Sequence, residues 1–232
     1  MLPEAFLFDF DGVIADTESV WFSCIVSFAE RHALPVSRAA LEEYIGDGDT
    51  GMMRLLAAAL GSEEKLRELY PEMQTEFRQR TESLGMKAGV ADYLNFACER
   101  GIALACTSSS RRNYILHWLD KLGIRERFSV VVTRDDLADD ARVKPAPDLY
   151  LLTLRRLGSE ASRCIAFEDS IPGLRAAAAA GVPCARIPSP VTDALPAGPA
   201  VWTLDMGHTP PETFFREYQV NIKTGGSSHA DG

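Results

Sequence analysis

Two aspartates with one residue between them, Asp9 and Asp11, follow a short apolar segment at residues 5–8. A strand interior accommodates a carboxylate poorly, because burying one without a partner costs several kcal/mol or forces it to bind a proton. Residues two apart point to the same side of an extended segment. One carboxylate could therefore attack phosphorus, while the other protonates a leaving oxygen and later activates water.

Polar residues also follow three later β-prone segments. TSSS occupies residues 107–110, Lys144 lies in RVKPAPD, and Glu168 and Asp169 end CIAFED. The carboxyl ends of parallel strands meet at one edge of a sheet, so we expect these groups to converge. Clustered carboxylates favour a cation, and oxygen ligands suit Mg²⁺. The hydroxyls, the backbone N–H groups and the lysine would hold a phosphoryl group.

Each of these motifs also has a simpler interpretation. The first pair could form a turn at a strand end, and the serines could cap the helix that starts near Arg111. Lys144 could be a solvated loop lysine, and the acidic pair could cap the next helix, although Ser170 is the better cap. Four such motifs in order favour the chemical interpretation.

The elements that would position these residues alternate along the chain. We expect buried strands at residues 5–8, 101–107, 128–133, 164–169 and 182–187, and an edge strand at 201–206. Helical patterns lie between them at residues 90–100, 111–122, 147–157 and 171–180. Glycines follow these helical patterns where a left-handed cap is wanted, at positions 101, 123, 158 and 181. The alternation predicts an α/β fold, a doubly wound parallel sheet.

A long helical stretch separates the first strand from the others. Residues 17–84 show helical spacing throughout, so we expect an all-helical cap inserted after the first motif. The predicted domains are a core of residues 1–16 and 86–210, a cap of residues 17–85, and a C-terminal segment, 211–232. The end of that segment, TGGSSHADG, is predicted to be disordered.

Four stretches resemble a known family. They are DFDGVIADTE at residues 9–18, TSSSR at 107–111, KPAPD at 144–148 and FEDSIPGLRAAAAAG at 167–181. In order and spacing they resemble the haloacid dehalogenase-like (HAD) superfamily, in the branch of β-phosphoglucomutase-like phosphatases with a helical cap. The resemblance implies a HAD-type Rossmannoid core with an inserted cap.

The resemblance also implies catalytic roles. Asp9 would be the nucleophile and Asp11 the general acid/base. Ser108 and the amide of Ser109 would bind the transferring phosphoryl group, and Lys144 would bridge that group to Asp9. Dehalogenases and phosphonate-cleaving relatives lack the second aspartate, so Asp11 favours phosphate-ester chemistry.

The same resemblance implies a metal site. Mg²⁺ would be held by Asp9, the backbone carbonyl of Asp11 and Asp169, with Glu168 as a further ligand or as a supporting neighbour of one. Mg²⁺ is therefore the predicted cofactor.

The cap motif YIGDGDTGMMR, residues 44–54, leaves two interpretations open. It could reach over the site and contact the substrate, with Gly46 and Arg54 as substrate-binding residues. It could equally be a helix–helix connection, with Arg54 an exposed helical charge. Trp21 stands where the mutase relatives carry a histidine, which favours hydrolysis over phosphomutase activity.

Composition and net charge exclude some classes of binding partner. The 232 residues carry a formal net charge of −9, which disfavours nucleic acid over the general surface. No apolar stretch has the length of a membrane span, and the N-terminal residues lack the basic region of a signal peptide. Five scattered cysteines suggest buried free thiols in a reducing compartment, so we expect a cytoplasmic protein.

These observations lead to one expected function and two rivals. We expect Mg²⁺-dependent hydrolysis of a small phosphorylated metabolite, a sugar phosphate or a relative of one, by a monomer or small homo-oligomer. One rival is a sugar phosphomutase like β-phosphoglucomutase. The other is a non-catalytic binding protein on the same scaffold.

Overall fold

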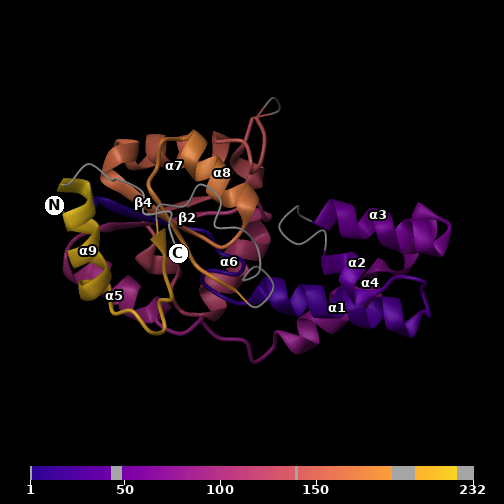
Figure 1. Cartoon of the computed structure of the whole chain (residues 1–232). Helices are drawn as coiled ribbons and strands as arrows, with labels where there is room; N and C mark the ends of the chain where they lie inside the picture. Colours follow the sequence, from indigo (N-terminus) through magenta and orange to yellow (C-terminus); the bar gives the residue numbers. More distant parts are fainter. Residues whose placement is uncertain (1, 43–48, 139–140, 190–201, 224–232) are drawn as a thin grey trace.

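The computed structural model describes residues 2–42, 49–138, 141–189 and 202–223. A six-stranded sheet, entirely parallel, lies at the centre of the larger lobe (Figure 1). Its strand order is β3-β2-β1-β4-β5-β6, so the chain turns to one side of β1 and then to the other. This is the predicted doubly wound arrangement. The strands are β1 (Ala5–Phe8), β2 (Ala103–Thr107), β3 (Val130–Val132), β4 (Cys164–Glu168), β5 (Cys184–Arg186) and β6 (Trp202–Thr203).

Helices cover both faces of this sheet. The side chains of β1 alternate between two hydrophobic clusters: Phe6 and Phe8 enter one, and Ala5 and Leu7 enter the other. A strand that is buried on both faces reads as a continuous apolar run, which is why AFLF contains no polar residue. The helices of the first cluster are α5 (Val90–Glu99), α6 (Arg112–Lys121) and α9 (Pro211–Lys223), and those of the second are α7 (Asp148–Leu157) and α8 (Ile171–Ala179).

The C-terminal helix α9 was not predicted. It lies beside α5 in Figure 1, and Phe214, Phe215 and Tyr218 are buried in the first cluster. The ring of Phe215 stacks on that of Phe6 with centroids 4.8 Å apart. The start of the C-terminal segment therefore completes the core beneath the sheet.

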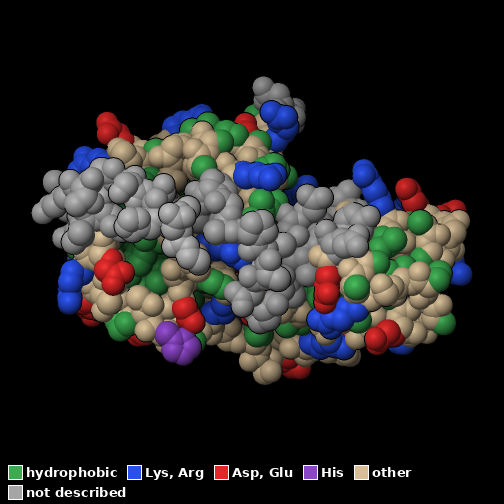
Figure 2. Space-filling view, in the orientation of Figure 1, with side chains coloured by type: hydrophobic (Ala, Val, Ile, Leu, Met, Phe, Trp, Pro, Cys, Tyr) green, Lys and Arg blue, Asp and Glu red, His purple; other side chains and the backbone are tan. Residues whose placement is uncertain are grey.

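The described residues of the smaller lobe form helices and the turns between them. The helices are α1 (Thr17–Arg31), α2 (Arg38–Glu42), α3 (Asp49–Leu60) and α4 (Glu63–Arg80). They lie to one side of the sheet in Figure 1 and have a hydrophobic cluster of their own, which includes Phe22, Ile25, Phe28, Leu56 and Met73. On the face shown in Figure 2, acidic and basic side chains are interspersed over both lobes.

Local details agree with most of the sequence predictions. The four glycines expected at helix ends have φ between 65° and 74°. Single 3₁₀ turns add η1 (Arg125–Arg127), η2 (Arg134–Asp136) and η3 (Ala161–Arg163).

Four cysteines are buried as expected, but Cys98 is exposed on α5. Among the described helices, none combines the length and apolar character needed to cross a bilayer.

Candidate active site

One buried ammonium group joins the ends of three neighbouring strands. The Lys144 side chain, only 5% exposed, lies in the segment before α7. Its Nζ donates to Asp9 Oδ1 and, at 2.8 Å, to the carbonyl oxygen of Thr107, and it lies 2.5 Å from Glu168 Oε1. The three N–H donors of the lysine thus meet three acceptors. The convergence predicted for β1, β2 and β4 is present.

The carboxylates outnumber this ammonium. Burial raises the pKa of Asp9, and Glu168 and Asp11 raise it further, against the opposing effect of Lys144. Burial also raises the pKa of Asp169, with Asp9 as the next cause. Burial alone would lower the pKa of Lys144, but Asp9 and Glu168 outweigh it and raise that pKa. The site therefore has an excess of negative charge that a cation would neutralise.

Asp9, Glu168 and Asp169 form a group that suits a metal ion. Each offers a carboxylate oxygen, and these oxygens all lie within 4.8 Å of one another. Glu168 Oε2 and Asp169 Oδ2 are buried, and neither has a hydrogen-bond partner within the described part of the chain. Buried polar atoms are normally paired, so such orphaned oxygens call for a ligand. Oxygen donors alone suit a hard divalent cation such as Mg²⁺.

Two glycines make room for these carboxylates. A Cβ on Gly12, where φ is +79°, would lie 1.9 Å from Asp169 Oδ2. A Cβ on Gly173 in α8 would lie 1.9 Å from Glu168 Oε2. Both glycines stand inside the quoted motifs, but nothing in their local sequence shows which side chain would occupy the space. Their role could therefore not be predicted from the sequence.

Tyr150 is a further site residue that the sequence did not single out. Its buried hydroxyl donates to Glu168 Oε1 at 2.5 Å. Lys144 contacts the same oxygen, so Oε1 is occupied and Oε2 is the free oxygen of this carboxylate. Tyr150 and Lys144 together orient Glu168.

Asp11 lies outside the carboxylate group. Its Oδ1 accepts hydrogen bonds from Thr17 at 2.7 Å and from Tyr114 at 3.1 Å, and its Oδ2 accepts one from Ser110 at 2.7 Å. Burial and then the Asp11 charge raise the pKa of Tyr114, so its phenol remains a hydrogen donor. Thr17 and Tyr114 were not predicted, and Ser110 was noted only as part of the hydroxyl cluster.

The serines after β2 do not cap α6, so that simpler interpretation is wrong. The amide of Arg112 at the start of α6 donates to Asp135 at 2.8 Å. Ser108 is buried, and its Oγ accepts from the amide of Ser110 at 3.0 Å. Ser109 Oγ is buried, with no hydrogen-bond partner among the residues that the structure describes. Ser109 thus has a free hydroxyl at the end of β2.

The side chain of Thr107 faces the opposite direction. Its hydroxyl lies 2.9 Å from that of Thr153 in α7, and only its carbonyl faces Lys144. Ser170 caps α8 by accepting from the amide of Gly173 at 3.2 Å, so Asp169 is not the cap of that helix.

Three residues singled out in the sequence, Trp21, Gly46 and Arg54, belong to the predicted cap of residues 17–85. Arg54 is exposed on α3, and Gly46 lies outside the described residues. Trp21 is half-buried, and its ring lies edge-on to Tyr70 and Phe77 at 5.9 and 5.6 Å between centroids. The ring of Trp21 therefore packs against aromatic side chains of α4.

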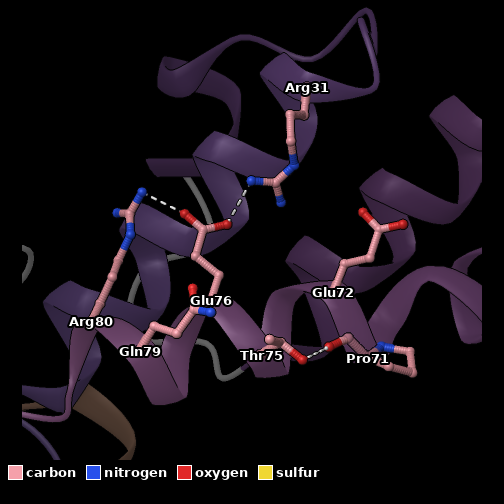
Figure 3. Close-up of a pocket in the computed structure, with 7 residues that line it drawn as sticks. All are labelled: Arg31, Pro71, Glu72, Thr75, Glu76, Gln79 and Arg80. Carbon is pink, nitrogen blue, oxygen red and sulfur yellow. Dashed lines mark hydrogen bonds and ion pairs between the residues drawn. The ribbon is translucent and has the colours of Figure 1, made fainter.

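A surface depression of about 690 Å³ lies between α1 and α4 but has none of this chemistry. Figure 3 shows Arg31 and Arg80 both reaching Glu76, with Arg31 at 2.8 Å. Glu72 pairs with His32 at 2.9 Å. The acidic groups that line the depression are therefore paired with Arg31, Arg80 and His32, and none of the strand-end residues lines it.

Comparison with known proteins places this site in a family. The model of haloacid dehalogenase-like hydrolases matches residues 6–187. YhcW of Bacillus subtilis (strain 168), which is named as a phosphatase, is 34% identical over 194 residues, 83% of this chain and 86% of that protein. The phosphorylated carbohydrates phosphatase of Thermotoga maritima is 31% identical over 180 residues, 77% of this chain and 82% of that protein.

A solved structure shares the fold and part of the sequence. A variant of CbbY from Rhodobacter sphaeroides, in complex with xylulose-(1,5)bisphosphate, matches with a TM-score of 0.70 and 26% identity. The match covers 89% of this chain and 96% of that one. The chain therefore belongs to the haloacid dehalogenase-like hydrolases, and within that family it is a phosphoric monoester hydrolase.

Proposed function

We propose that this protein hydrolyses a small phosphomonoester of the sugar-phosphate type, with Mg²⁺, through an aspartyl-phosphate on Asp9. The observation that carries the proposal is the buried Lys144 that joins Asp9 to Glu168, beside orphaned carboxylate oxygens on Glu168 and Asp169. The names of two relatives, a phosphorylated carbohydrates phosphatase and a protein solved with a sugar bisphosphate, support the substrate class.

The metal would be held by oxygens of the chain, and two of these, Glu168 Oε2 and Asp169 Oδ2, have no other partner among the described residues. Asp9, Glu168 and Asp169 would supply carboxylates, and the resemblance adds the backbone carbonyl of Asp11. When bound, Mg²⁺ would neutralise these carboxylates and the charge on the phosphoryl oxygens. The glycines at positions 12 and 173 keep that space open.

The chain's own residues would perform the transfer. Lys144 occupies Asp9 Oδ1, which leaves Oδ2 to attack phosphorus. As the bond from phosphorus to the leaving oxygen breaks, that oxygen takes a proton from Asp11. Asp11, now a carboxylate, then takes a proton from the water that attacks the aspartyl-phosphate, which releases phosphate and restores Asp9.

Two further groups would hold the substrate. Ser108 and the amide of Ser109 at the end of β2 would bind the phosphoryl oxygens. We propose that residues 17–85 act as a cap over the core of residues 1–16 and 86–210, with Gly46 and Arg54 as its candidate substrate contacts. Closure of such a cap would exclude water while the aspartyl-phosphate forms.

The test is phosphate release from a panel of sugar phosphates, other alkyl phosphates and p-nitrophenyl phosphate, with Mg²⁺ and with EDTA. We expect Mg²⁺-dependent release that Asp9→Asn abolishes without changing the melting temperature in EDTA by more than a few degrees. Asp120→Asn, at an exposed carboxylate of α6, is the matched control and should retain full activity. Release by Asp9→Asn at the wild-type rate would overturn the mechanism.

The same panel distinguishes the mutase. A phosphomutase would interconvert sugar phosphates with little free phosphate. Where the mutase relatives carry a histidine, this chain has Trp21, which is not a base and whose ring packs against Tyr70 and Phe77. We therefore expect phosphate, not an isomer, as the product.

A further inference from the structure

The two oxygens of Asp11 are held unequally. Oδ1 accepts two hydroxyl hydrogen bonds, from Thr17 at 2.7 Å and Tyr114 at 3.1 Å. Oδ2 accepts one, from Ser110 at 2.7 Å. A carboxylate that must exchange a proton with substrate has to release at least one partner. Oδ2, with a single donor among the residues that the structure describes, is the oxygen that is more easily freed.

The two donors on Oδ1 come from different lobes. Thr17 is the first residue of α1 in the helical lobe, whereas Tyr114 lies in α6 against the sheet. Thr17 can follow the helical lobe if that lobe moves. Tyr114 is attached to the same lobe as the carboxylate group, so its contact to Asp11 does not depend on the position of the helical lobe.

The phenol of Tyr114 is positioned by packing and not only by Asp11. Its ring lies edge-on to Trp118, with centroids 6.3 Å apart. Trp118 in turn packs against Phe10, the residue before Asp11, at 6.1 Å. Tyr114 is half-buried against the first hydrophobic cluster. Because the ring is fixed by these contacts, the hydroxyl is already in place when Asp11 needs it.

We propose that Tyr114 is a positioning residue for Asp11: it holds Oδ1 so that Oδ2 faces the leaving oxygen, which takes the place of the Ser110 hydroxyl. The inference rests on the proposed function, since it assigns Asp11 the proton transfer. The electron pair of the breaking bond goes to the leaving oxygen, and the proton comes from Asp11 Oδ2. Asp9 forms the new bond to phosphorus, so this step needs no further reactant.

The experiment compares two leaving groups in Tyr114→Phe, which removes only the hydroxyl. One substrate is the sugar phosphate that the wild type hydrolyses fastest, because its alkoxide leaving group needs a proton. The other is p-nitrophenyl phosphate, because its phenolate leaves with little need of one. The quantity measured is kcat/KM, which includes the first phosphoryl transfer and excludes the later hydrolysis of the aspartyl-phosphate.

We expect kcat/KM for the sugar phosphate to fall about tenfold in Tyr114→Phe, and that for p-nitrophenyl phosphate to stay within about twofold. A purely structural role would lower both values equally. Tyr93→Phe is the matched control, because that buried hydroxyl donates to the carbonyl of Thr209 at 3.0 Å, away from the site. It should leave both values unchanged.

A second variant guards against misfolding. Thr17→Val removes the other donor to Oδ1 and should give the same selective loss. Equal losses on both substrates in the two variants, or no loss in Tyr114→Phe, would overturn the assignment of Tyr114. A wild type inactive on every phosphomonoester would contradict the proposed function instead, so the two failures are distinguishable.

Discussion

Among single residues, Lys144 is the one whose removal should change the electrostatics of the site most. Its buried ammonium contacts Asp9 and Glu168, whose side chains are 10% and 0% exposed. Removing one member of a buried charge network leaves the others without a counter-charge, which is far more costly than losing a surface pair.

Lys144→Met should therefore affect stability as well as activity. We expect the free energy of unfolding in EDTA to fall by about 3–5 kcal/mol, and kcat to fall by at least about 100-fold. Urea titration and initial rates of phosphate release measure the two effects. Lys65→Met, on the exposed start of α4, is the control and should change neither. A Lys144→Met protein as stable as the wild type would contradict the contacts of Lys144 with Asp9 and Glu168.

Gly173→Ala tests the space beside Glu168. In most helices this change adds up to about 1 kcal/mol of stability, but here the new Cβ would lie 1.9 Å from Glu168 Oε2. We expect a loss of about 1–3 kcal/mol, and Mg²⁺ affinity at least about tenfold weaker because a ligand is displaced. Urea unfolding and Mg²⁺ titration by calorimetry are the measurements.

Gly85→Ala is the matched control for that variant. Nothing lies within 4 Å of a Cβ at Gly85, and its backbone does not need a positive φ. Its free energy of unfolding should stay within about 0.5 kcal/mol of the wild type. A Gly173→Ala protein as stable as this control, with unchanged Mg²⁺ affinity, would rule out the crowding.

At the scale of elements, the short turn η2 ties α6 and α7 to the edge strand β3. Asp136 in η2 accepts hydrogen bonds from the amide and the hydroxyl of Thr133, both at 2.9 Å. Arg112 of α6 and Arg156 of α7 reach the same carboxylate at 3.0 and 2.9 Å. The Asp136 side chain thus links α6 and α7 to the residue that follows β3.

Asp136→Ala should weaken that edge in a pH-dependent way. Burial opposes the charge of Asp136, but Thr133 and the two arginines outweigh it and lower its pKa. A depressed pKa stabilises the fold above the unfolded-state value near about 4, and this contribution disappears as pH falls through the folded-state pKa. We expect a deficit of about 1–3 kcal/mol near neutral pH that shrinks below about pH 4, measured by urea unfolding across pH.

Asp120→Ala provides the contrast for this prediction. Asp120 pairs with Arg125 at 2.8 Å, but both side chains are about half exposed. Such pairs contribute about 0.5 kcal/mol or less. A deficit in Asp136→Ala no larger than this, or one that does not change with pH, would contradict the role given to η2.

At the scale of the whole molecule, both connections between the lobes meet at the loop after β1. Thr17 at the start of α1 donates to Asp11. On the return connection, Lys87 donates from Nζ to the carbonyl of Gly12 at 2.5 Å and from its backbone to that of Ile14 at 2.8 Å. The loop that carries Asp11, the proposed acid/base residue, is therefore also the junction of the two lobes.

Metal binding should stabilise the whole chain, because the proposed ligands Asp9, Glu168 and Asp169 come together at the ends of β1 and β4 only in the folded state. At a Mg²⁺ concentration near 100 times Kd the gain is about 2.7 kcal/mol, or a Tm higher by about 5–10 °C for a chain of this size. Differential scanning calorimetry with Mg²⁺ and with EDTA measures it. Asp169→Asn should lose the increment, and an unchanged increment in that variant would remove Asp169 from the metal site.

The strand–helix alternation and the residues at the strand ends can be predicted from the letters alone, because both are local properties of the chain. AFLF, Lys144 and the pair Glu168–Asp169 could be recognised without coordinates, since polar residues at the end of an apolar run are visible in the letters. Helix α9 was not predicted in this way. Its apolar side chains pack against residues distant in the sequence, as Phe215 does against Phe6.

Which of these residues touch depends on how the elements pack in three dimensions. Lys144 reaches Asp9 across 135 positions, and Tyr114 reaches Asp11 across 103. Such contacts depend on strand order and helix packing, which no local pattern encodes. The position of Gly173 against Glu168 is of the same kind, because an absent side chain is informative only when its neighbour is known. The residue types indicate which chemistry is possible, and packing selects the partners that carry it out.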